Sequence, residues 1–139
     1  MSRVIVRVLA VAALSVSAYV HLHLAHLYPY PGTITGTQLF DIQGVTAAVI
    51  ALALLVTGNR WVWLAAAGIG LSSFAAVMLY RYVDVGALGP LPNMNDGTWM
   101  PSPDKPASAV AEALVPLLFG VLVLLDRRRI HRRSATRSG

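Results

Sequence analysis

Four long apolar runs, separated by shorter polar stretches, dominate the pattern of hydrophobic and polar positions along the chain. They cover residues 4–22, 39–57, 61–83 and 107–125. A helix that crosses about 30 Å of hydrocarbon needs about 20 predominantly apolar residues, and each run comes close to that length. Inside a bilayer the backbone must satisfy its own hydrogen bonds, which favours helices. The pattern therefore predicts an all-α protein with a four-transmembrane-helix domain over residues 1–126.

The polar segments between these runs predict how the helices are connected. Residues 58–60 form a three-residue turn, so the second and third helices should form an antiparallel hairpin. Residues 84–106 make the longest connection and contain five prolines, which disfavour a regular helix there. We expect an up-down-up-down bundle in which the two longer loops lie on one side of the membrane.

The composition supports lipid as the main solvent of this chain. Of its 139 residues, 56% are hydrophobic and 12% are charged, whereas soluble domains carry about 25% charged residues. The chain has no cysteine, which excludes disulfides, thiolate metal sites and covalent haem attachment.

The distribution of cations predicts the orientation. If the N-terminus is cytoplasmic, nine of the eleven lysines and arginines lie on cytoplasmic segments, and only Arg81 and Lys105 lie outside. This positive-inside bias predicts a multi-pass protein of the plasma (cytoplasmic) membrane with both termini in the cytoplasm. Residues 127–139 would form a basic cytoplasmic tail. Because this tail directly follows an apolar run, we interpret it as a topology signal and expect no nucleic-acid partner.

An alternative interpretation concerns the N-terminus. Two arginines, an apolar segment and the small residues 16–18 resemble a cleavable signal peptide, and cleavage after Ala18 would leave three helices. The apolar run continues past Ala18, which favours a retained helix.

Rows of small residues predict which helix faces meet, since helices in lipid associate through close backbone approach. One row is Ala13, Ser17 and His21 in the first helix, and another is Gly68, Ser72 and Ala76 in the third. We expect both rows to face the interior of the bundle.

Polar and ionisable residues from all four helices should lie at a similar depth near the non-cytoplasmic boundary. This polar cluster consists of His21, His23, His26, Asp41, Gln43, Arg81, Asp84 and Glu112. Ionisable groups within membrane segments are costly, and they usually pair with one another or face a water-filled cavity. The cluster is either structural, with Arg81 paired to a carboxylate, or the lining of an outward-facing pocket for a metal, a proton or a small polar ligand.

A metal or another cofactor has weaker support from the sequence. His23 and His26 share a helix face and could bind zinc or copper together with Asp41 or Glu112, yet their spacing matches no specific metal motif. Two histidines three residues apart on one helix cannot occupy opposite axial positions of a haem. No nucleophile elbow, P-loop or dinucleotide-binding pattern is present in the sequence. The sequence thus favours a non-enzymatic protein without a cofactor, and it leaves both questions open.

Two stretches carry a resemblance to a known family. They are HLHLAHLYPYPGTITGTQLFDIQG (residues 21–44) and LYRYVDVGALGPLPNMNDGTWMPSPDKPASAVAEA (residues 79–113). Together they resemble a family of uncharacterised small four-helix integral membrane proteins common in actinobacteria. The resemblance implies the four-helix membrane fold and no particular activity.

Three functions remain open from the sequence. The first is a non-enzymatic membrane component or accessory subunit that binds a membrane protein partner or forms a homo-oligomer. The second is an outward-facing module that binds or transports a metal, a proton or a small ligand through the polar cluster. The third is a subunit of a redox or quinone-linked membrane enzyme.

Overall fold

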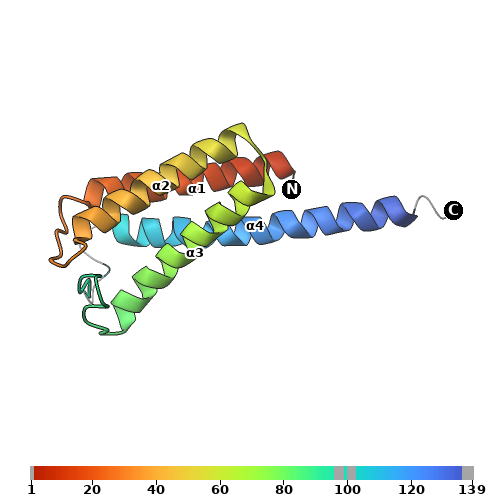
Figure 1. The fold of residues 1–139 in the computed structure, drawn as a ribbon. Helices are drawn as coiled ribbons and strands as arrows, with labels where there is room; N and C mark the ends of the chain where they lie inside the picture. Colours follow the sequence, from red (N-terminus) through yellow and green to blue (C-terminus); the bar gives the residue numbers. More distant parts are fainter. Residues whose placement is uncertain (1, 96–98, 100–102, 136–139) are drawn as a thin grey trace.

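The structure is a computed structural model that describes residues 2–95, 99 and 103–135, with side chains described up to Arg127. Its four helices are α1 (Arg3–Leu24), α2 (Gly36–Val56), α3 (Arg60–Tyr82) and α4 (Asp104–Ala135) (Figure 1). Each contains a segment that is long and apolar enough to cross a membrane; in α4 this segment is Asp104–Arg127. The predicted all-α fold with four helices is thus confirmed.

Local capping explains where the first three helices begin. The Ser2 hydroxyl accepts from the backbone N–H of Ile5 at 3.3 Å, and the Asn59 side chain accepts from that of Trp61 at 2.9 Å. Thr35 and Gln38 form a capping box, in which each side chain accepts from the backbone N–H of the other. This box starts α2 at Gly36, earlier than the residue 39 expected from hydropathy.

Helix α4 extends beyond both ends of the predicted run at residues 107–125. It begins at Asp104 and includes Pro106 in its first turn, where a missing N–H costs little. It continues to Ala135, so the basic segment predicted as a tail is helical from residue 127 to 135. Arginine is a good helix former, and no glycine or proline interrupts this segment. Residues 136–139 of that segment lie outside the described residues.

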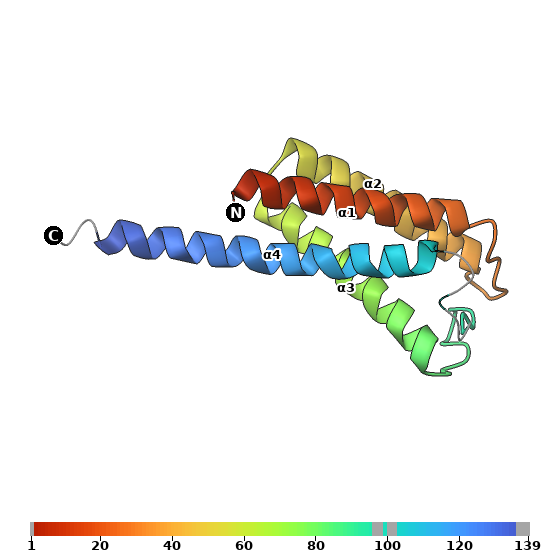
Figure 2. The same ribbon diagram turned by 180° about the vertical axis from the view of Figure 1, so that it is seen from behind.

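The packing of the helices is uneven. Helix α1 packs along α2 and α4, and α3 packs mainly against α4 and less against α2. Figures 1 and 2 show that α2 and α3 meet at their short turn and then diverge toward the end that carries the two longer loops. At the opposite end, Arg3 pairs with Asp126, and the Arg7 guanidinium donates to the carbonyl of Leu55 at 2.9 Å.

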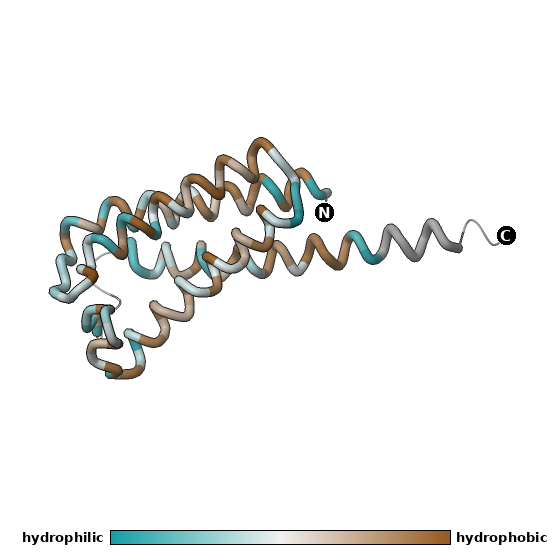
Figure 3. Tube along the Cα trace, viewed as in Figure 1, coloured by the Kyte–Doolittle hydropathy of each residue, from teal (hydrophilic) through white to brown (hydrophobic). Residues whose placement is uncertain are grey.

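The two longer loops contact each other. The N–H of Ile34 in the first loop donates to the carbonyl of Pro90 in the second at 3.0 Å. The Tyr80 hydroxyl donates to the Pro92 carbonyl at 3.3 Å, which fixes the second loop to the end of α3. Hydrophilic positions gather in these loops and near the opposite end, whereas apolar positions dominate the helices between them (Figure 3). The loops therefore cover the end at which α2 and α3 diverge.

One small-residue row is buried as the sequence predicts, and the other is exposed. Ala13, Ser17 and His21 are buried in the bundle, as expected. In α3, however, Gly68, Ser72 and Ala76 are exposed, and the buried small residues are Ala66, Gly70 and Ser73. The predicted row therefore does not pack against α4, since the face that meets α4 is rotated from it, although Ser72 and Ala76 line a cavity between the helix ends.

Candidate functional site

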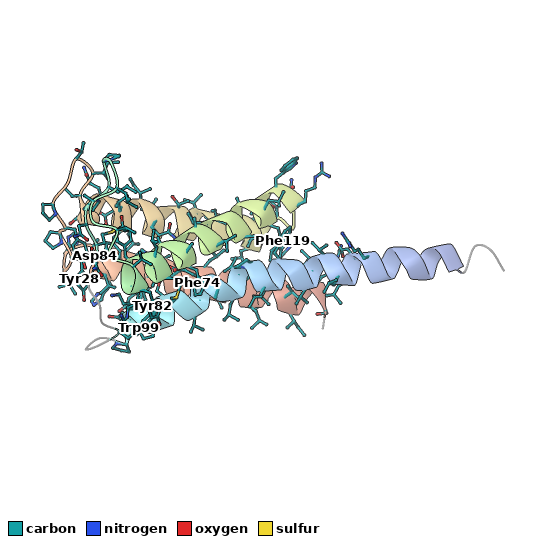
Figure 4. The ribbon with its side chains drawn as sticks, turned by 90° about the horizontal axis from the view of Figure 1, so that it is seen from below. Tyr28, Phe74, Tyr82, Asp84, Trp99 and Phe119 are labelled. Atoms are coloured by element: carbon teal, nitrogen blue, oxygen red, sulfur yellow. The ribbon has the colours of Figure 1, made fainter. Side chains whose placement is uncertain are left out.

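A cavity of about 310 Å³ lies between the diverging helix ends and the two loops. All four helices and both loops contribute to its wall. The described residues that line it are Val20, His21, Leu24, Tyr28, Tyr30, Leu39, Phe40, Gln43, Ser72, Ser73, Ala76, Val77, Tyr80, Arg81, Met94, Trp99, Lys105 and Ser108. Figure 4 shows Tyr28, Tyr82, Asp84 and Trp99 gathered at this end of the molecule, whereas Phe119 lies away from it. Most of the wall is apolar or aromatic, with polar groups at separate points.

The charged residues of this described wall are cationic. Arg81 and Lys105 line the cavity, and none of the described lining residues is acidic. The Arg81 guanidinium lies 5.0 Å from the ring centroid of Tyr82 and 5.8 Å from that of Trp99. Such cation–π contacts hold a guanidinium without neutralising its charge.

Arg81 keeps hydrogen-bonding capacity in this position. Its Nε atom is buried and has no hydrogen-bond partner among the described residues. No described carboxylate forms an ion pair with it, so the expected pairing of Arg81 with Asp41, Asp84 or Glu112 does not occur within that part of the chain. The cavity thus contains a guanidinium with donors available to an anionic ligand.

A second feature, beside the cavity, is a buried polar group of four side chains that joins α1 to α4. It consists of Ser17 and His21 on α1 with Ser108 and Glu112 on α4. Each pair is four residues apart, so its members lie on one helix face. The hydroxyls of Ser17 and Ser108 donate to Glu112 Oε1 at 3.1 and 2.7 Å. We call these four residues the Ser-His-Glu group.

The Glu112 carboxyl is almost completely enclosed. Its residue is 1% exposed, and its Oε2 atom is buried without a hydrogen-bond partner among the described residues. The Glu112 carbonyl is freed because Pro116, four residues later, has no N–H. That carbonyl faces Gly70 of α3, where an added Cβ would lie 2.8 Å from it. Glu112 therefore lies at the point where α1, α3 and α4 meet.

His21 connects the Ser-His-Glu group with the cavity. Its Nδ1 atom lies 2.9 Å from the Ser17 carbonyl oxygen, and its Nε2 atom lies 3.6 Å from Glu112 Oε1. The same imidazole lines the cavity and contacts the Phe40 ring with centroids 5.3 Å apart. One histidine thus touches both the buried carboxyl and the space that a ligand would occupy.

The structure gathers only part of the predicted polar cluster. His21 and Glu112 are in contact, and Gln43 and Arg81 line the same cavity as His21. His23 is exposed and stacks on Tyr19, with ring centroids 5.7 Å apart.

The remaining members of the predicted cluster lie apart from this site. His26 is exposed, and Asp41 is half-buried but is not among the described lining residues. Asp84 is exposed and accepts from the N–H of Gly86 at 3.3 Å.

The residues considered as metal ligands do not come together as one group. His23 and His26 are exposed, whereas Glu112 is buried between α1 and α4. Within the described residues, no three histidine, aspartate or glutamate side chains are arranged to hold a metal ion.

Sequence reasoning missed Ser108, Phe40 and Tyr80 as site residues. Ser108 had a usable signal, since it precedes Glu112 by one helical turn in an otherwise apolar run. Phe40 and Tyr80 had none, because aromatic residues are expected at any membrane boundary.

Comparisons of the chain with protein-family models, with curated proteins and with solved structures give no match. The function must therefore be argued from the cavity and the Ser-His-Glu group.

Proposed function

We propose that this chain is a multi-pass protein of the plasma membrane, with its helices up-down-up-down and both termini in the cytoplasm. The four apolar helices support a membrane location. Nine of the eleven lysines and arginines lie in Arg3, Arg7, Arg60 and the C-terminal segment, and this bias favours a cytoplasmic position for those parts. On this proposal the cavity lies near the non-cytoplasmic boundary. The family resemblance noted in the sequence is consistent with it.

Its proposed role is that of a non-enzymatic membrane component that binds a single-chain amphipathic anion in the cavity. The observation that carries this role is a largely apolar cavity of about 310 Å³ with two cations and no described acidic residue in its wall. Ligand sites in proteins are typically apolar spaces of about 300–1,000 Å³ with a few placed polar groups. The volume suits a ligand with one short apolar chain.

The two parts of such a ligand match different parts of the wall. The side chains of Val20, Leu39, Phe40 and Val77 offer apolar surface to a hydrocarbon chain. The guanidinium of Arg81, whose Nε atom has no partner among the described residues, offers donors to a carboxylate, phosphate or sulfonate, and charge-assisted hydrogen bonds of this type are the stronger ones. Binding of an amphipathic anion is thus better supported than docking to a protein partner or redox chemistry.

Quenching of Trp99 fluorescence tests this role. The probe is a brominated medium-chain alkyl sulfonate, added to protein in nanodiscs of zwitterionic lipid. Trp99 lines the cavity, so a bound brominated chain should quench it, and the Trp99→Phe variant gives the background from Trp61 and Trp63. A bromoalkyl alcohol of the same chain length measures the binding of a probe that lacks the anionic group.

Matched variants distinguish quenching by probe bound in the cavity from quenching by probe dissolved in the lipid. Ala76→Phe fills the cavity, whereas Ala75→Phe makes the same change at a neighbouring exposed position that does not line it. We expect quenching to be lost in Ala76→Phe and kept in Ala75→Phe. Arg81→Met should weaken sulfonate binding about tenfold or more, since a hydrogen bond to a charged group contributes about 1.5–3 kcal/mol, and should change alcohol binding little. Equal quenching in Ala76→Phe and Ala75→Phe would refute the proposal.

A further inference from the structure

We infer that His21 and Glu112 form one proton-binding site inside the bundle, and that its protonation is linked to occupation of the cavity by an anion. The linkage rests on the proposed ligand-binding function, whereas the proton site itself does not. The observations behind it are the contact between the two side chains, the unpartnered Glu112 Oε2 atom and the position of His21 in the cavity wall.

The hydrogen bonds of His21 fix the tautomer of its ring. A carbonyl oxygen can only accept, so Nδ1, which lies 2.9 Å from the Ser17 carbonyl, carries a hydrogen and donates it. The hydrogen bond at one ring nitrogen decides the role of the other. In the neutral imidazole, Nε2 is therefore the basic atom, and it is the atom that faces Glu112 Oε1 at 3.6 Å.

In this tautomer, Nε2 of a neutral His21 and Oε1 of an ionised Glu112 are both acceptors, and they face each other. A proton on one of the two atoms removes this unfavourable contact. With one proton in addition to the hydrogen on Nδ1, His21 and Glu112 are either imidazolium and carboxylate or imidazole and carboxylic acid. The net charge of the pair is zero in both cases. With a second proton taken from water, imidazolium and carboxylic acid are present together, and the net charge is +1.

The surroundings of Glu112 leave room for a proton on its second oxygen. Ser17 and Ser108 both donate to Oε1, whereas Oε2 has no partner among the described residues. In the doubly protonated form, the protonated Nε2 of His21 faces Oε1 and the carboxylic-acid proton lies on Oε2, which fits this asymmetry. Ionisable residues buried between membrane helices are typical of proton pathways.

Besides Glu112, the charged and titratable side chains nearest to His21 among the described residues are those that line the same cavity. Helix α3 contributes Arg81 and Tyr80, α4 contributes Lys105, and the first loop contributes Tyr28 and Tyr30. Helix α2 contributes Leu39, Phe40 and Gln43 to the described wall, and none of them is charged. An anion bound in the cavity would therefore face His21 together with Arg81 and Lys105.

The sign of the linkage follows from these charges. A second proton on the pair adds a positive charge beside the cavity, so an anion binds more tightly to the protonated form. By reciprocity, anion binding draws a proton onto the pair. The affinity for an anion should thus rise as the pH falls.

Infrared difference spectroscopy tests the proton site without any ligand. Spectra of the protein in nanodiscs at two pH values should contain a carboxylic-acid stretch that shifts in D₂O and is absent from Glu112→Gln. Glutamine keeps the size of the side chain and an acceptor for both serines. If no pH-dependent carboxyl band is lost in Glu112→Gln, the proton site is overturned.

The pH dependence of Trp99 quenching tests the linkage. The sulfonate probe stays anionic over about pH 5–8, the range in which imidazole ordinarily changes charge. Wild-type protein should bind it about tenfold more tightly at the acid end, since one added charge in a partly buried site is worth at least that factor. The double variant His21→Gln/Glu112→Gln should lose this dependence, and each single variant should move its midpoint. His26→Gln, an exposed histidine of the same segment, should behave as wild type.

The outcomes separate the two proposals. An unchanged pH dependence in the double variant would refute the linkage, even with an infrared band from Glu112. Failure of Ala76→Phe to reduce quenching would refute the ligand cavity and leave the infrared result to decide the proton site. If the double variant fails to fold, the near-isosteric Glu112→Gln alone decides, and an unmoved midpoint in it would overturn the linkage.

Discussion

Replacing Gly70 with alanine should separate α3 from α4, and the structure allows the size of this effect to be estimated. A Cβ atom at position 70 would lie 2.8 Å from the Glu112 carbonyl oxygen, 3.2 Å from Val115 Cβ and 3.3 Å from Pro116 Cδ. The nearest of these atoms belongs to the backbone and cannot rotate away. The helices must therefore move apart, and overpacking of this type costs about 1–3 kcal/mol.

Gly68 provides the matched control. It lies two positions earlier in the same helix, and a Cβ atom there would meet nothing within 4 Å. Alanine is favoured over glycine inside a helix by about 0.5–1 kcal/mol, and this gain is common to both substitutions. The difference between Gly70→Ala and Gly68→Ala therefore isolates the steric cost, which we expect to be about 2 kcal/mol.

Reversible unfolding in mixed micelles with increasing sodium dodecyl sulfate, followed by helix circular dichroism, measures this difference. Gly68→Ala should unfold at the same or a higher denaturant fraction than wild type, and Gly70→Ala at a clearly lower one. Equal free energies of unfolding for the two variants would refute the close approach of α3 to α4 at Glu112.

Two further predictions concern the start of α2 and the orientation in the membrane. Thr35→Ala removes the capping box and should lower the free energy of unfolding by about 1 kcal/mol. Thr33→Ala, at an exposed loop position, should change that free energy little. The same unfolding assay compares the two variants, and equal effects would contradict the role of the cap. A fluorescent-protein fusion at the C-terminus should be bright in cells, and alkaline phosphatase inserted after Ala87 should be active, because we propose that these points lie on the cytoplasmic and outer sides of the membrane. The reverse pattern would overturn the orientation.

Much of the helical architecture follows from local features of the chain. The apolar runs predict the four helices because lipid excludes any segment whose backbone groups are unsatisfied. The helix boundaries differ from those of the apolar runs where polar residues form local hydrogen bonds. Thr35 and Gln38, for example, start α2 before its apolar run begins. Arginine-rich residues likewise continue α4 past its apolar run.

The sequence predicted only part of the candidate site. The sequence pointed to His21 and Glu112 as members of a polar cluster, and the row Ala13, Ser17, His21 indicated the buried face of the first helix. It favoured His23 and His26 as ligands because they share a helix face, yet both are exposed. Periodicity identifies residues that lie on one face, but it does not identify which face meets a neighbour.

The sequence by itself determined the number of helices long and apolar enough to cross a membrane, their helical conformation and the clustering of cations, because these depend on hydropathy and charge along a single chain. Only the tertiary structure decided that α3 meets α4 through Gly70, that α2 and α3 diverge to leave a cavity, and that His21 rather than His23 or His26 faces Glu112. The physical reason is that lipid contacts each apolar helix face almost equally well. The choice of the buried face therefore depends on the fit between helices far apart in sequence.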